Sequence, residues 1–145
     1  MRIRWTAPVE FSPMNQPILV PVSVGELFDK QTILQIKRER IHDAGKLLHV
    51  ERELALLSQQ ADEFLASCSQ GGEIRELARQ LHTVNSALWD LENEVRACDR
   101  AARFDETFIA AARKIYAGND RRAAIKLSIN VSAGSDIVEV KSHVQ

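Results

Sequence analysis

The segment Glu73–Arg103 constrains the fold more than any other part of the chain. Its apolar residues recur at alternating intervals of three and four: Ile74, Leu77, Leu81, Val84, Leu88, Leu91, Val95, Cys98 and Ala102. This spacing is the heptad pattern of a helix that packs along its length against another helix. At 1.5 Å per residue, such a helix would be roughly 45 Å long. The segment therefore predicts an elongated protein built around one long helix.

The preceding segment, Lys46–Ser67, repeats the same heptad spacing, and the glycine pair at residues 71–72 indicates a tight turn between the two. Two heptad helices joined by a short turn predict a long, antiparallel, coiled-coil-like hairpin. In such a hairpin Cys68 lies beside the turn and Cys98 lies roughly 35 Å away. A disulfide needs Cα atoms within about 7 Å, so both cysteines are predicted to be core thiols.

An N-terminal helix is predicted over Val24–Asp43, because Ser23 and Glu26 form a capping box at its start. This helix is apolar on two sides, which is typical of a helix that lies between neighbours. We expect it to pack along the hairpin.

After the long helix, local signals divide the chain into two short helices at the base of the hairpin. Asp105 is a good cap for the first, which Gly118 is expected to end. Asn119 or Asp120 would then cap a second helix that Gly134 closes.

Together these patterns predict one all-α domain over residues 1–145. Residues 1–22 would be an irregular or extended arm, 23–134 a helical bundle and 135–145 an extended tail. The tail is expected to pair with residues 18–22. A chain of this length buries enough apolar surface to fold as a single domain.

Composition excludes several classes of function. The formal net charge is −1, which argues against nucleic acid as a partner, and no apolar run approaches the length of a membrane span. No metal or other cofactor is expected, because the spacing of the four histidines matches no zinc site. A cytoplasmic location is the default. The length of the hairpin and its exposed heptad flanks favour a homodimer, or a protein partner along the hairpin.

The charge is distributed unevenly along the chain. Acidic residues predominate in Glu51–Val95, and basic residues predominate in Arg96–Lys126. The hairpin converts this into a spatial difference, with an acidic end at the turn and a basic end at the base. A partner that carries a phosphate or carboxylate is therefore expected at the base.

A first candidate site lies in the segment Asn119–Lys126. Arg121 and Arg122 would sit in the first turn of a helix, where the helix dipole favours acids. Together with the free amides of that turn they would form a compact anion site. The alternative is that these arginines pair with carboxylates such as Asp29 or Glu139 and fix the tail.

A second polar cluster lies on the N-terminal helix, where burial of the second apolar side would place charged residues partly inside. Such charges form either a structural ion-pair network or a ligand pocket. In a pocket, the arginines would clamp the anion and Asp29 would orient them. The full candidate anion site is Asp29, Lys30, Lys37, Arg40, Arg121, Arg122 and Lys126. No catalytic residue is assigned.

Trp89 lies one position off the heptad stripe, on a side that also carries arginines. An exposed tryptophan in this setting would contact a partner or a base. The alternative is that a third helix covers it.

Two stretches, Val20–Ile41 and Asn119–Ser142, resemble a family of short bacterial helical proteins of unknown function. The resemblance is carried by Val20–Lys30, by the Ile33–Ile41 segment, and by Asn119–Lys126 with Ile129, Asn130 and the Glu139–Ser142 segment after it. It implies no activity. Because the two stretches contain the two polar clusters, it favours their lying together.

A weaker resemblance is to the helical chorismate mutases, through the spacing of Asp29, Ile33 and Arg40. The arginine and lysine pattern that those enzymes carry is absent here. The function expected from the sequence is therefore a non-enzymatic binding or scaffold protein. The alternative is a small helical enzyme that acts on an anionic metabolite by electrostatic stabilisation.

Overall fold

The computed structural model describes residues 16–142, and this part of the chain contains no β-strand. Its four helices are α1 (Val24–Arg40), α2 (Ala44–Ser67), α3 (Gly71–Arg100) and α4 (Glu106–Ala133). The all-α prediction is confirmed. The described parts of the arm and tail are extended but do not pair as strands. Predictions for residues 1–15 and 143–145 lie outside the described residues.

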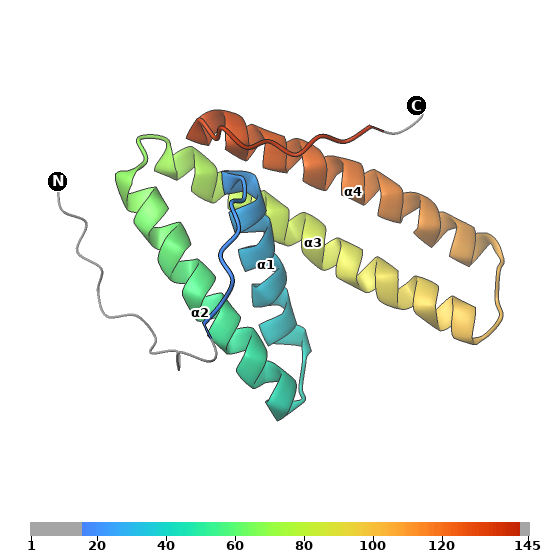
Figure 1. Ribbon diagram of the computed structural model, residues 1–145. Coiled ribbons are helices and arrows are strands. Elements are labelled where there is room, and N and C mark those ends of the chain that lie inside the picture. Colours follow the sequence, from blue (N-terminus) through green and yellow to red (C-terminus); the bar gives the residue numbers. More distant parts are fainter. Residues whose placement is uncertain (1–15, 143–145) are drawn as a thin grey trace.

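α3 is the longest helix, and the buried residues of its heptad stripe confirm its central place in the core: Ile74, Leu81, Val84, Leu88 and Cys98. α4 lies beside α3 over much of its length (Figure 1). α2 instead meets α3 near their connection and then diverges from it. The predicted α2–α3 hairpin is thus not confirmed, because the long helix pair of this fold is α3–α4.

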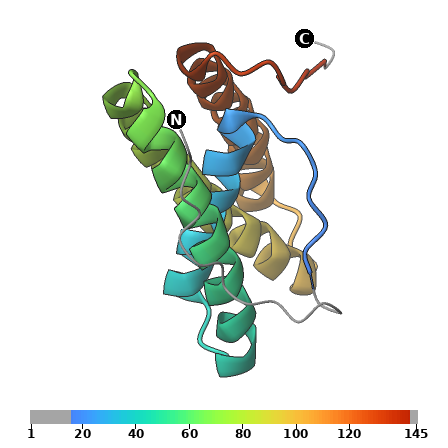
Figure 2. The ribbon, with the colours of Figure 1, turned by 60° about the vertical axis from the view of Figure 1, so that its left-hand side comes forward.

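α1 contacts each of the other three helices, and Figure 2 shows it between α2 and α4. Its buried apolar residues enter two clusters. Phe28 packs in the main core with residues of α3 and α4, whereas Leu34 packs against Val50 and Leu54 of α2. The prediction of a helix enclosed by neighbours is confirmed, as is its N-cap, since the Ser23 hydroxyl oxygen accepts from the Glu26 amide at 3.0 Å.

The prediction of two short C-terminal helices is wrong, because α4 is continuous. It begins after the Asp105 cap and ends at Gly134, which has φ of 65°. Gly118 lies inside it and faces α3: a Cβ atom there would lie 2.7 Å from Leu88 Cδ2. Close packing of the two helices explains this glycine. Because Arg121 and Arg122 lie in a helix interior, the predicted anion site at a helix N-terminus does not exist.

The cysteines are free, with Cys98 buried and Cys68 partly exposed. None of the helices in the described residues is both long and apolar enough to cross a membrane.

Candidate functional site

A buried polar network joins α1 to α3 at Asp29, whose exposed fraction is 5%. The Asn85 side-chain nitrogen of α3 donates to Asp29 Oδ1 at 2.8 Å and to Thr32 Oγ1 at 3.0 Å. The Thr32 hydroxyl in turn donates to the Asp29 carbonyl oxygen at 2.8 Å. These bonds compensate for the cost of taking the carboxylate out of water.

Lys126 connects α4 to the same network. Its Nζ atom lies 2.5 Å from Glu26 Oε2, 3.7 Å from Asp29 Oδ2 and 3.8 Å from Glu139 Oε1. Its side chain is only 15% exposed. One partly buried ammonium group therefore faces three carboxylates, and it holds α1, α4 and the tail together.

Glu139 anchors the tail to the start of α1. The Ser23 hydroxyl donates to one of its carboxylate oxygens, and Asn130 Nδ2 donates to the other at 3.0 Å. The Asn130 side-chain oxygen accepts from the Gly25 amide at 2.7 Å. The tail, α4 and the N-terminus of α1 thus form one hydrogen-bonded unit.

Opposing effects act on the pKa of Glu139. Burial raises the pKa. Hydrogen bonds from Ser23, from the Glu139 backbone and from Asn130, together with the charge of Lys126, lower the pKa by more than burial raises it. The net pKa of Glu139 is therefore below the ordinary glutamate value. A group with a lowered folded pKa stabilises the fold above its unfolded pKa. That contribution is lost as the pH falls through the folded pKa.

Acid should therefore release the tail. At neutral pH we expect the backbone amides of residues 136–142 to be restrained, and to gain mobility as the pH falls from the ordinary glutamate pKa of about 4.3 through the lower pKa of the anchored Glu139. NMR relaxation of these amides across the titration measures this. In Glu139→Gln, which lacks the charge, the tail should be mobile at neutral pH already. Equal mobility of the wild-type tail at both ends of the titration would contradict the anchor.

The seven residues of the predicted anion site do not form one cluster. Asp29 and Lys126 meet, which confirms that the two polar clusters lie together. Arg40 pairs with Asp90 of α3 at 2.8 Å, and Lys30 lies 4.0 Å from Glu53 of α2. The remaining three are Lys37, which is half-buried on α1, and Arg121 and Arg122 of α4, which are exposed and half-buried respectively.

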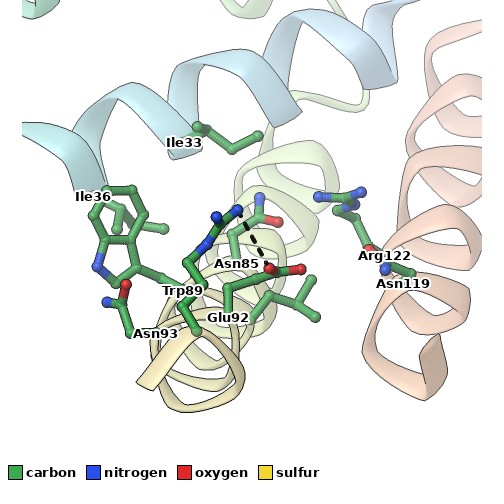
Figure 3. A pocket seen from close by; sticks show the side chains of 10 residues that line it. Ile33, Ile36, Asn85, Trp89, Glu92, Asn93, Asn119 and Arg122 are labelled. Carbon is green, nitrogen blue, oxygen red and sulfur yellow. Dashed lines mark ion pairs between the residues drawn. The ribbon is translucent and has the colours of Figure 1, made fainter. Parts of the chain in front are cut away.

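Arg122 instead lines a pocket of about 500 Å³ that opens between α1, α3 and α4. Figure 3 shows Trp89 and Ile36 on one side of this pocket, Arg122 and Asn119 on the opposite side, and Asn85 between them. Trp89 is half-buried, so it is neither fully covered nor isolated on the surface. The pocket therefore has an aromatic surface on one side and a guanidinium group on the other.

The orientation of the Asn85 amide is fixed by its partners. The Asp29 carboxylate only accepts hydrogen bonds, and the Thr32 hydroxyl proton is already used on the Asp29 carbonyl. Both therefore require the Asn85 NH₂ group, and the amide oxygen must point away from them. That oxygen is buried and has no hydrogen-bond partner among the described residues.

The charges of the pocket are also incompletely paired. Arg96 lies 3.9 Å from Glu92 on the same helix. Within the described residues, no carboxylate forms an ion pair with Arg122, although its neighbour Lys126 has three such partners. An unpaired guanidinium group and an unpaired buried acceptor thus belong to one pocket.

A second pocket, of about 370 Å³, lies on the side of Arg122 that faces the tail. Asn119 and Arg122 line both pockets. Lys126, Glu139 and Lys141 also line the second one. Arg122 therefore lies between the two pockets and borders each of them.

Several residues of this site were missed in the sequence, above all Asn85, Thr32 and Asn130. One signal for Asn85 was present: it follows Leu81 by four positions and precedes Leu88 by three, which places it on the buried side of α3. A polar residue at such a position needs a partner. Thr32 carries no comparable signal, whereas Asn130 lies in the stretch that resembles the family.

Comparison with known proteins gives one match. The model of a protein family described as "Family of unknown function (DUF6165)" matches residues 18–144, which is most of the chain. Neither the curated proteins nor the solved structures contain a match. Among residues 16–142, no group of His, Cys, Asp and Glu side chains is arranged to hold a metal ion.

Proposed function

The chain belongs to the DUF6165 family of unknown function, and we propose that its pocket between α1, α3 and α4 binds a small organic anion. One observation carries this proposal: the pocket is lined by a half-buried arginine that has no carboxylate partner within residues 16–142, and by Asn85, whose buried amide oxygen has no donor among the same residues. A ligand that has an anionic group and an N–H or O–H group satisfies both.

Two magnitudes support a ligand of this kind. A buried acceptor without a partner costs roughly 1–3 kcal/mol, which a ligand donor to Asn85 would recover. An arginine is suited to carboxylate or phosphate, because its planar fork donates two parallel hydrogen bonds. The charged residues that line the pocket are Arg96, Arg122 and Glu92, so the formal charge of the lining is positive.

The proposal is binding without turnover. Apart from the arginines, the one ionisable side chain among the pocket-lining residues described is Glu92, which already faces Arg96. These lining residues include no serine, cysteine, histidine or tyrosine to act as a nucleophile or general acid. A non-enzymatic cytoplasmic binding protein therefore stays the favoured function over a small enzyme. The homodimer and a protein partner along the helices stay predictions.

Arg122→Gln should weaken the binding of small anions by tenfold or more, because a hydrogen bond to a charged group contributes roughly 1.5–3 kcal/mol. Isothermal titration calorimetry with glycolate, 3-phosphoglycerate, 4-hydroxybenzoate and adenosine monophosphate measures this. The matched control is Arg121→Gln, because Arg121 is the exposed neighbour and lines neither pocket.

The control variant should bind as the wild type does, since both substitutions remove one positive charge from the same turn of α4. Equal weakening by the two substitutions would show a nonspecific charge effect. Absence of binding for all four anions at millimolar concentration would overturn the proposed function.

A further inference from the structure

We infer that the anion bound in this pocket is aromatic, with its ring against Trp89, a ring-borne N–H or O–H group at Asn85 and its anionic group at Arg122. The inference rests on the proposed function and names the class of its ligand. It follows from how the three kinds of side chain are placed along the pocket.

The side of the pocket opposite Arg122 carries the indole of Trp89 and the side chain of Ile36, with the amide of Asn93 next to Trp89 (Figure 3). Two further apolar side chains also line the pocket, Ile33 and Leu88. Trp89 is half-buried, although an indole is among the largest apolar groups that a core can cover. A flat ring placed against it would cover this surface and gain the preferred contact between two aromatic systems.

Two polar side chains, Asn85 and Arg122, line the pocket beyond Trp89. Asn85 precedes Trp89 by four residues in α3, which is about one helical turn. It lies on the side of Trp89 that faces Arg122. A donor attached to the ring would therefore meet the amide oxygen while the ring stays on Trp89. The anionic group would then extend to Arg122, which projects from α4 on the far side.

The volume agrees with one ring and its substituents. Pockets of roughly 300–1,000 Å³ hold small molecules and cofactors. The first pocket, of about 500 Å³, lies within this range. Beyond Arg122, the second pocket of about 370 Å³ provides further volume for a larger anionic group.

Two sources supply this chemistry: an aromatic acid that carries a hydroxyl or amino group, and a nucleoside monophosphate, whose base carries the donor. Both combine a flat ring, a donor and an anion. They differ in the distance between ring and anion, and a pair of matched probes for each source separates them.

The test is a fluorescence titration of the full chain with the substitution Trp5→Phe. The sequence contains two tryptophans, so Trp89 becomes the single reporter. The first pair of probes is 4-hydroxybenzoate and its saturated analogue 4-hydroxycyclohexanecarboxylate. The second pair is adenosine monophosphate and ribose 5-phosphate, which lacks the base. Excitation at the red edge of the indole band avoids absorption by the probes.

We expect an aromatic member of at least one pair to change the Trp89 emission and to bind tenfold or more tightly than its ring-free or saturated partner. The pair that shows this difference identifies the source. Trp89→Leu should abolish the difference within the pair, and Trp89→Phe should restore most of it. These two variants are followed by calorimetry, and their thermal melts show whether the fold is kept.

The outcomes separate the two claims. Equal affinity within both pairs, with dependence on Arg122, would overturn the aromatic ligand and leave the proposed function intact. Absence of binding for all probes would overturn the proposed function itself. Tighter binding of the aromatic probe without any change in the emission of Trp89 would place the ring elsewhere, and would also overturn the inference.

Discussion

Lys126→Met is expected to destabilise the protein by about 3–5 kcal/mol at neutral pH, because removing one member of a buried ion-paired group leaves its partners uncompensated. The substitution keeps the length and the apolar stem of the side chain. It leaves Glu26, Asp29 and Glu139 facing one another, with the Asp29 carboxylate almost fully buried. Equilibrium unfolding in urea measures the change.

The matched control is Lys141→Met, because Lys141 also forms a close ion pair, with Asp120, but at the protein surface. An exposed pair contributes about 0–1 kcal/mol, so this control should unfold at nearly the wild-type urea concentration. The destabilisation by Lys126→Met should also shrink at acidic pH, as Glu139 becomes neutral. Equal effects of the two substitutions would contradict the central role of Lys126.

Gly25→Ala is expected to destabilise the protein by roughly 2–4 kcal/mol, because a methyl group would be forced into a closely packed contact. A Cβ atom at this position would lie 2.6 Å from the Lys126 carbonyl oxygen and 2.9 Å from Asn130 Oδ1. α1 and α4 would have to separate. Separation would also weaken the hydrogen bond from the Gly25 amide to Asn130.

Gly72→Ala provides an unusually close control. Gly72 is the second residue of α3, as Gly25 is the second residue of α1, and a Cβ atom at Gly72 would meet nothing within 4 Å. Alanine there should be neutral or stabilise by up to about 1 kcal/mol, through its higher helix propensity. Thermal or urea unfolding of the two variants compares them directly. A Gly25→Ala protein as stable as Gly72→Ala would show that α1 and α4 do not approach closely.

The sequence predicted each helix better than it predicted the pairing of helices. The heptad stripe of α3 and the cap and two apolar sides of α1 were readable, because periodicity and capping are local properties. Which helix packs against which could not be predicted from these patterns. α2 carries a heptad stripe as clear as that of α3, but α1 lies against α2, and α4 becomes the partner of α3. Periodicity shows that a face is buried without showing what buries it.

The prediction for α4 failed for a different reason: packing against α3 outweighed the local signals for the end of a helix. Gly118 followed by Asn119 and Asp120 is a typical helix stop and cap. Here the glycine provides room for Leu88 of α3, and the helix continues. Gly118 and Leu88 are far apart in the chain, so the sequence around Gly118 does not predict their contact.

The candidate site was predicted in part. Asp29 and Lys126 were found because helical spacing and charge single out the two polar clusters that contain them, and the resemblance to one family favoured the clusters lying together. Glu139 was considered as a partner of the arginines, but it lies beside Lys126 instead, and this leaves Arg122 unpaired within the described residues. The unpaired amide oxygen of Asn85 depends on two hydrogen bonds made by the other half of the same side chain. Only the three-dimensional structure shows such a pattern.

A crystal structure with the tightest-binding anion of the calorimetry panel tests the central claim most directly. We predict that the anion lies between α1, α3 and α4, with its charged group on the Arg122 guanidinium and a donor within hydrogen-bond distance of Asn85 Oδ1. A closed pocket in which Arg122 itself donates to Asn85 Oδ1, with the anion bound elsewhere, would contradict the claim. In that case the arginine and the asparagine would be partners of each other, and the pocket would have no role in binding.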